Sequence, residues 1–202
     1  MTKVIDMVGT ISYEAYDNPY VFLVDIIIGQ MLSNKVADIM SERLRTLCKR
    51  SITPNKIIKL TDNQIKSIGI SNLKVKFIRE LTDKVNNKQI DFDSISKLDD
   101  EDAIKRLASI HDIGSWSAKM YLIFVLNRQD ILPYEDVAFL QCYKWGYNTN
   151  ILNKESIAKR LKKIKPYRSI VARIKGTLFK DVINITIFNS VNLNPKIRPN
   201  FY

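Results

Sequence analysis

The order of apolar and polar residues predicts a chain made of helices. Residues 20–29 (YVFLVDIIIG) are almost wholly apolar, which is typical of a buried helix, and Asn18 and Pro19 can start it. Apolar residues then recur at helical spacing after Ser33 or Asn34, either of which can cap the next helix. The first part of the chain is therefore expected to contain two successive helices.

Capping residues indicate where later helices begin. Thr61 and Gln64 have the spacing of a capping box, and a long amphipathic helix follows Ser71. Asp99 or Asp100 opens a further helix, which we expect to end near residue 110. No internal repeat interrupts this order, so the predicted fold class is all-α.

The most informative stretch is a tight turn between two helices, at residues 111–114 (HDIG). The helix after it, from residue 115 to about 127, is almost wholly apolar. Gly114 can adopt the positive φ that such a turn demands, Asp112 tolerates it, and Ser115 can cap the second helix. Backbone N–H groups at a helix start form a natural phosphate site.

A second candidate site lies about twenty residues further on. The segment 132–136 (LPYED) places two carboxylates, Glu135 and Asp136, behind a proline and before another predicted helix, 137–145. Either carboxylate could take part in chemistry. The alternative is that Asp136 only caps the helix that follows it.

Charge favours a polyanionic partner. The net charge is +11 with a pI near 9.6, and residues 154–180 carry ten Lys or Arg against one acid, a local charge of +9. The alternative is a solvated basic helix face. After it, residues 182–188 are rich in β-branched side chains and leave helix and strand open, and residues 194–202 are expected to be irregular.

Length and composition fit a globular protein. The chain has 202 residues, of which 46% are hydrophobic, enough for one domain or two small lobes. No apolar run reaches the roughly 18 residues of a membrane span, and no signal peptide pattern is present. We expect no membrane contact and a location in the cytoplasm, at the nucleoid, or in the nucleus if the source is eukaryotic.

The hairpin, followed at this distance by Leu-Pro-x-x-Asp, resembles the helix-hairpin-helix (HhH-GPD) base-excision DNA glycosylases, and among them the 3-methyladenine DNA glycosylase II type. Segments 30–33 (QMLS), 71–74 (SNLK) and 165–169 (KPYRS) add to the resemblance, which covers residues 18–172. It implies two helical lobes with the active-site cleft between them. One lobe is 19–128, with the helix-hairpin-helix at 107–127, and the other is 1–18 plus 129–202.

The resemblance implies a monofunctional enzyme that flips a damaged base, most plausibly an alkylated purine such as 3-methyladenine, and hydrolyses its N-glycosidic bond. Asp136 would be the catalytic carboxylate that stabilises the positively charged sugar, although a swap with Glu135 stays open. The lysine of bifunctional relatives is replaced by Trp116, so lyase activity is not expected. Asp112 stands where the family has a glycine, which puts a negative charge near the expected phosphate.

Roles for other residues follow from the same resemblance. Met31, with Gln30, would form the wedge that enters the base stack; the alternative for Met31 is a core methionine. The base pocket would contain Trp116, Tyr167, Met120 and Tyr134, and the alternative for Trp116 is a core residue. Contacts to DNA phosphates are expected from His111, Ile113, Gly114, Ser115, Ser117, Lys119 and Arg168.

Cofactors and partners are expected to be few. No cofactor is required, although the carbonyls of Ala108, Ile110 and Ile113 could hold a structural Na⁺ or K⁺. Two cysteines, Cys48 and Cys142, are too few for an iron–sulfur cluster. The expected partner is double-stranded DNA with a damaged base, bound by a monomer. The alternatives are a non-catalytic DNA-binding protein and a glycosylase for uracil, a mispaired base or a modified base.

Overall fold

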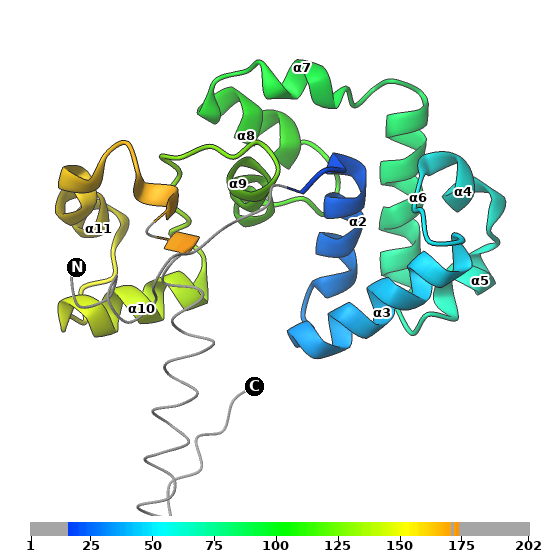
Figure 1. Cartoon of the computed structure of the whole chain (residues 1–202), viewed down its shortest axis with the longest axis horizontal. Coiled ribbons are helices and arrows are strands. Elements are labelled where there is room, and N and C mark those ends of the chain that lie inside the picture. Colours follow the sequence, from blue (N-terminus) through cyan, green and yellow to red (C-terminus); the bar gives the residue numbers. More distant parts are fainter. Residues whose placement is uncertain (1–15, 171, 174–202) are drawn as a thin grey trace, which may run out of the picture. The chain divides into compact units, whose positions relative to one another are not determined.

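The computed structural model of the chain describes residues 16–170, 172 and 173, and every regular element in that part is a helix (Figure 1). The predicted all-α class is confirmed. The expectations for residues 182–188 and 194–202 lie outside the described residues. The helices are α2 (Pro19–Gly29), α3 (Asn34–Leu47), α4 (Pro54–Lys59), α5 (Asp62–Lys66), α6 (Asn72–Asn86), α7 (Phe92–Ser96), α8 (Asp100–Ala108), α9 (Ser115–Phe124), α10 (Val137–Tyr147), α11 (Lys154–Arg160) and the 3₁₀ helix η1 (Leu161–Ile164).

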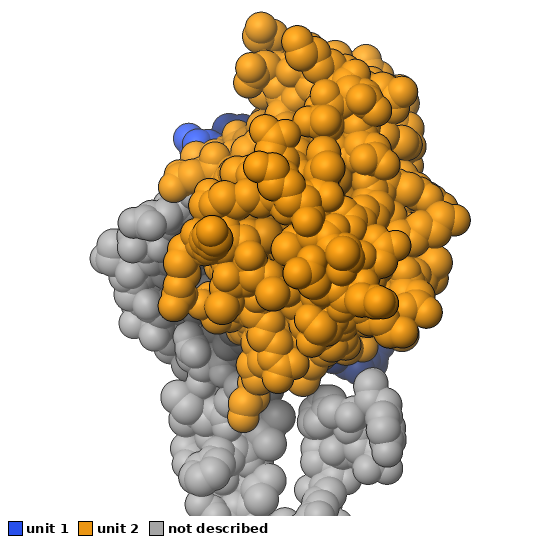
Figure 2. Space-filling view, turned by 90° about the vertical axis from the view of Figure 1, so that its right-hand side faces the viewer, with its two compact units in different colours: residues 1–14, 129–202 blue, residues 15–128 orange. Residues whose placement is uncertain are grey.

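The chain separates into two compact units (Figure 2). Residues 15–128 form the first, which we call the hairpin unit, and residues 129–202 with 1–14 form the second, the C-terminal unit. Helices α2 to α9 belong to the hairpin unit, and α10, α11 and η1 belong to the C-terminal unit. No helix in the described part of the chain has the length and apolar character needed to cross a membrane.

Helix α2 is the centre of the hairpin unit. It contacts α3, α6 and α9, and Leu23, Val24, Ile27 and Ile28 on it are fully buried (Figure 1). The apolar run YVFLVDIIIG predicts a buried helix, because a helix that is apolar on all sides needs neighbours that cover most of its surface. Helix α3 departs from this pattern, because its predicted apolar face is covered at Leu44 but exposed at Val36, Ile39 and Leu47.

The predicted caps are largely confirmed. Asn18 Oδ1 accepts from the N–H of Val21, and the capping box of Thr61 and Gln64 is complete in both directions. Asp99, and not Asp100, caps α8 by accepting from the N–H of Asp102. These bonds satisfy N–H groups that lie before the first intrahelical hydrogen bonds, so short helices such as α5 can form.

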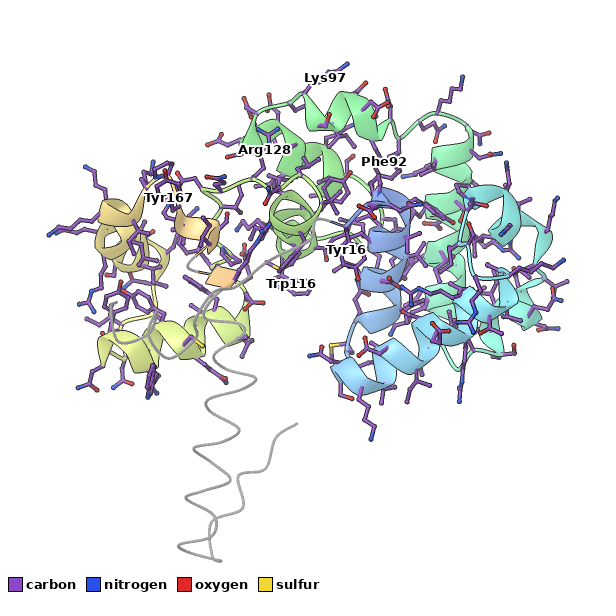
Figure 3. All side chains as sticks on the ribbon, in the orientation of Figure 1. Tyr16, Phe92, Lys97, Trp116, Arg128 and Tyr167 are labelled. Atoms are coloured by element: carbon purple, nitrogen blue, oxygen red, sulfur yellow. The ribbon has the colours of Figure 1, made fainter. Side chains whose placement is uncertain are left out.

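Arginines join the ends of neighbouring helices in the hairpin unit. Arg43 donates to the carbonyl of Ile68 at 3.0 Å. Arg128 donates to the carbonyls of Ser96 and Leu98, at 2.8 and 2.9 Å, on either side of Lys97 (Figure 3). A guanidinium can serve two carbonyls at once because its donors form a fixed fork.

The C-terminal unit has a small core of its own. It consists of the buried residues Leu132, Phe139, Tyr143, Ile157 and Leu161, which come from the 132–136 turn, α10, α11 and η1. The turn is therefore attached to the core of its unit through Leu132.

Removing the side chain of Leu23 should test the central role of α2. Leu23→Ala is expected to lower the free energy of unfolding by about 2–5 kcal/mol, because the fully buried side chain leaves a cavity. Leu73→Ala, the same change at a position that is 58% exposed, should change it by no more than about 0.5 kcal/mol. Urea unfolding followed by circular dichroism measures both. Equal losses in the two variants would contradict a core centred on α2.

Candidate functional site

The hairpin joins α8 to α9 with a left-handed residue at Asp112. Asp112 has φ +68°, and the N–H of Ile113 donates to the carbonyl of Ile110 at 3.0 Å. The expectation that Gly114 has a positive φ is wrong: its φ is −82°, and it is the N-cap of α9. The expected cap Ser115 is instead the first residue of the helix. The left-handed position favours glycine, and Asp is among the few other residues that adopt it.

The helix after the hairpin is shorter than predicted. It ends at Phe124 and not near residue 127. Asn127 has φ +52°, and the N–H of Arg128 returns to the carbonyl of Leu122 at 2.9 Å. Such a left-handed residue closes a helix end, and the apolar run gave no sign of it.

A shallow hollow of about 580 Å³ lies at the hairpin. Residues 108–114 and Lys84 line it, and the start of α9 borders it at Gly114. A helix N-terminus presents backbone N–H groups and a positive dipole end, so an anion of phosphate size fits the chemistry of this hollow.

The residues expected to hold a monovalent cation border the same hollow. Ala108, Ile110 and Ile113 are all among its lining residues. The carbonyl of Ile110 also accepts the N–H of Ile113, and a carbonyl oxygen has a second lone pair. A Na⁺ or K⁺ held there would add positive charge beside a bound phosphate. That site stays a prediction.

His111 sits at the rim of the hollow. Its Nδ1 lies 2.7 Å from Glu80 Oε2, and its ring meets the Phe77 ring edge-on with centroids 4.7 Å apart. The hydrogen bond from His111 holds the pKa of the Glu80 carboxyl below its ordinary value. Glu80 is a partner that sequence reasoning did not identify, since it lies 31 residues away on α6.

The other residues expected to contact phosphate differ in access. Gly114 and Ser115 are exposed, and Lys119 is half-buried. The side chain of Ser117 is buried, at 5% exposed, and that of Ile113 at 2%. Only their backbone groups could therefore reach a phosphate, and a role for the Ser117 hydroxyl at a phosphate is corrected.

Met31 lies on a turn between α2 and α3 and is entirely exposed. Its side chain is 102% exposed and its φ is +58°, so the alternative of a core methionine is wrong. The Gln30 Nε2 group donates to the carbonyl of Asp112 at 2.9 Å. Lys74 Nζ donates to the carbonyls of Ile28 and Gln30, at 2.7 Å each. This turn is thus connected both to α6 and to the hairpin.

The aromatic residues expected in the base pocket fall in both units. Trp116 is half-buried, and its side chain extends from α9 on the side opposite α7 (Figure 3). Met120, one turn further along α9, is 7% exposed. In the C-terminal unit, Tyr167 is 52% exposed, and Tyr134 is half-buried with Lys154 Nζ 5.5 Å from its ring centroid. Their role in binding a base stays a prediction.

Asp136 caps α10 and is half-buried. Its Oδ1 accepts the N–H of Phe139 at 2.6 Å, and its own N–H donates to the carbonyl of Pro133 at 3.0 Å. Both bonds are local, so the 132–136 turn sets the position of the carboxylate. Glu135 beside it is exposed. Capping and access to solvent therefore occur together at Asp136.

Two residues of the 165–169 segment bind backbone and side-chain groups of residues 129–131, which lead into the 132–136 turn. Arg168 forms a two-pronged ion pair with Asp130, Nε to Oδ1 at 2.5 Å and Nη2 to Oδ2 at 2.7 Å. The buried Ser169 hydroxyl accepts the N–H of Ile131 at 2.8 Å, and the Ser169 N–H donates to the carbonyl of Gln129 at 2.7 Å.

Arg168 was expected to bind a DNA phosphate, and the structure instead commits its guanidinium to Asp130. The Arg168 side chain is 16% exposed, and Arg168 is the first cause of the lowered pKa of the Asp130 carboxyl. No sequence pattern predicts Asp130 as this partner, because it lies 38 residues before Arg168.

Comparisons with known proteins identify the family of the chain. The model of the HhH-GPD superfamily of base excision DNA repair proteins matches residues 24–166. The chain is 30% identical over 159 residues to the alkylbase DNA glycosidase-like protein mag2 of Schizosaccharomyces pombe, covering 76% of this chain and 75% of that protein. It is 26% identical over 158 residues to DNA-3-methyladenine glycosylase 1 of the same yeast, covering 76% and 69%.

Solved structures show the same fold. A DNA-3-methyladenine glycosidase from Bacillus halodurans superposes with a TM-score of 0.78 at 25% identity, over 91% of this chain and 85% of that one. The S. pombe 3-methyladenine DNA glycosylase Mag1, in complex with abasic DNA, superposes with a TM-score of 0.79 at 24% identity, over 89% and 90%.

The Asp130–Arg168 ion pair should make stability depend on pH. Its contribution is present above the ordinary pKa of an Asp carboxyl, 3.8, and is lost as the pH falls through the lower pKa of the folded state. Asp130→Asn should therefore lower the free energy of unfolding by about 2 kcal/mol at pH 6. The difference from the wild type should shrink below about pH 4.

Urea unfolding at pH 6, 4 and 3 measures this difference. Asp38→Asn, at an exposed carboxylate of α3, is the control for losing one negative charge. A difference for Asp130→Asn that stays constant down to pH 3 would count against the ion pair.

Proposed function

Because the chain belongs to the HhH-GPD superfamily of base excision DNA repair proteins, we propose that it is a monofunctional DNA glycosylase that removes alkylated purines from duplex DNA. The substrate named for two similar proteins from different organisms, 3-methyladenine, supports this base class. The observation that carries the proposal is a half-buried Asp136, fixed by local hydrogen bonds behind Leu132 and Pro133.

The proposed reaction is hydrolysis of the bond between the sugar C1′ and the base nitrogen. As that bond breaks, its electron pair leaves with the base, and positive charge develops on the sugar. Asp136 stabilises this charge, and a water oxygen then bonds to C1′ and gives up a proton to the Asp136 carboxylate. A carboxylate that its backbone already holds in place needs no reorganisation when the charge appears.

Water is the proposed nucleophile because the chain lacks a lysine at the position where bifunctional relatives carry one. Trp116 occupies that place, on α9 two residues after Gly114. Without an amine there, no Schiff base forms and the DNA strand is not cut. The product is an abasic site in an intact strand.

Alkylated purines suit a site with aromatic residues and a single carboxylate. A purine alkylated on a ring nitrogen carries positive charge, so it departs as a neutral base and requires no acid to protonate it. Its charge also favours contact with an aromatic face, such as that of Trp116 or that of Tyr167. Stacking of about 1–3 kcal/mol per base then offsets the few kcal/mol lost when the base leaves the duplex.

The proposed DNA contacts come from the hairpin, the Met31 turn and exposed lysines. The start of α9 and the hollow beside it would bind a phosphate, and Met31 would fill the gap in the base stack. Lys162, Lys163 and Lys165 are exposed in the C-terminal unit and would neutralise further phosphates.

A panel of duplexes with single lesions tests the activity. Wild-type protein should release 3-methyladenine or 7-methylguanine, and strands should break only after alkali treatment. Asp136→Asn should slow release by at least about a hundredfold. Asn is as good an N-cap as Asp, so α10 and the fold should be preserved, which thermal unfolding can check.

Glu135→Gln is the matched control, because it removes the neighbouring exposed carboxylate. It should retain nearly full activity. If Asp136→Asn retains activity and Glu135→Gln loses it, the catalytic assignment moves to Glu135. Release of uracil or a mispaired base alone would change the substrate class, and DNA binding without release of any base would indicate a non-catalytic binding protein.

Phosphate neutralisation by lysines predicts a dependence of affinity on salt. Replacing Lys162, Lys163 and Lys165 by Gln should reduce the slope of log K against log salt by up to about 3, since each lost phosphate contact lowers the slope by about 0.9. Fluorescence anisotropy of a labelled duplex gives the slope when it is measured between about 50 and 200 mM salt, where affinity that depends on phosphate contacts falls steeply. Replacing three exposed lysines of the hairpin unit, Lys59, Lys66 and Lys97, controls for net charge; an equal change there would contradict the assignment.

A further inference from the structure

The turn that carries Met31 requires contacts that hold its backbone. Met31 has φ +58°, a conformation that a non-glycine residue keeps only when its surroundings fix it. The side chain is 102% exposed, so packing of that side chain does not hold the turn. The fixing contacts must therefore act on the residues next to Met31.

Lys74 supplies such contacts from α6. Its ammonium donates to the carbonyls of Ile28 and Gln30, at 2.7 Å each. These carbonyls lie at the end of α2, where helix carbonyls lose their intrahelical partners and a positive charge is favourable. Lys74 thus fixes the backbone directly before Met31.

Gln30 extends the connection to the hairpin. Its side-chain Nε2 donates to the carbonyl of Asp112 at 2.9 Å. Asp112 is itself left-handed, with φ +68°. A single series of hydrogen bonds therefore runs from Lys74 through Gln30 to Asp112 and joins two strained turns that are 81 residues apart in the chain.

The carboxylate of Asp112 balances the charge of Lys74. Its Oδ2 atom is buried and, within the described part of the chain, has no hydrogen-bond partner. Burial raises the pKa of the Asp112 carboxyl, while Gln30, His111 and Lys74 oppose that rise. Burial also lowers the pKa of the Lys74 ammonium, and Asp112 opposes that change. The charge that stands in place of a hairpin glycine is thus directed to the interior of the hairpin unit.

We propose that Lys74, Gln30 and Asp112 form a clamp that locks the Met31 turn to the hairpin. When the hairpin holds a phosphate, the clamp thereby fixes the position from which Met31 enters the base stack. The inference rests on the proposed function, which supplies the damaged duplex. The three residues are positioning residues, because they act through Met31 and the hairpin backbone and contact no reacting atom.

The decisive experiment compares a lesion that must be flipped with one that is already unpaired. Lys74→Met should lower single-turnover release of 3-methyladenine from a fully paired duplex by about tenfold or more, since a small displacement of a positioning group is costly. Release from the same lesion in a single-nucleotide bulge should fall by less than about threefold. Lys66→Met is the matched control, at an exposed lysine of α5 in the same unit, and should behave as the wild type.

Combination with Met31→Ala tests whether the clamp acts through Met31. If it does, Lys74→Met should add little to the loss already caused by Met31→Ala, because the two changes remove the same interaction. Lys74→Arg, which keeps a cationic donor, should restore most of the activity. Losses that multiply in the double variant, or that are equal on paired and bulged duplexes, would overturn the proposal.

A readout that needs no base release separates this inference from the proposed function. The probe is 2-aminopurine, placed next to a tetrahydrofuran analogue of an abasic site. The fluorescence of 2-aminopurine rises when its stacking is disturbed. Wild type should raise the signal, and both Lys74→Met and Gln30→Leu should lower the amplitude several-fold, with thermal unfolding as a check of folding. A wild type that releases no base from any lesion counts against the proposed function alone, and amplitudes unchanged in both variants count against the clamp.

Discussion

Backbone groups at helix ends have no partner inside their own helix, so other residues must supply their hydrogen bonds. This requirement determines which residues stand at the helix ends of this protein. The helices described here are 4 to 15 residues long, so a large share of the chain lies at an end. Asn18, Thr61 and Asp99 satisfy N–H groups at helix starts, and Lys74 satisfies carbonyls at the end of α2. The positions for which we propose functional roles, Met31, Gly114 and Asp136, lie at such ends as well.

The capping role of Asp136 is compatible with the chemical role that we propose for it. A capping carboxylate uses one oxygen for a backbone N–H, and here Oδ1 accepts that of Phe139. The cap fixes the side-chain torsions, and the core residue Leu132 fixes the turn. A carboxylate oriented in this way is suited to electrostatic work, because its orientation is determined before any substrate arrives. The same position of the Asp136 side chain is thus compatible with capping and with the proposed catalysis.

Local patterns were sufficient to predict most of the helices, whereas long-range pairs were not. The apolar run of α2, the capping box at Thr61 and the hairpin at 111–114 each depend on neighbours in sequence, and the structure contains all three. The sequence offered Gly114 first and Asp112 second for the left-handed position, and the backbone torsions place it at Asp112, with φ +68°.

The pairs Asp130–Arg168 and His111–Glu80 and the hydrogen bonds of Lys74 join residues that are 31 to 46 positions apart, and no periodicity encodes such partners. Guanidinium groups are largely engaged within the scaffold: those of Arg43 and Arg128 bind carbonyls, and that of Arg168 binds Asp130. The positive charge presented to solvent at Lys162, Lys163 and Lys165 belongs to hydrated, rotatable ammonium groups, which attract phosphates without distinguishing one nucleotide sequence from another. A surface of this kind suits a protein that must travel along undamaged DNA in search of a rare target, because its binding is weak and independent of nucleotide sequence.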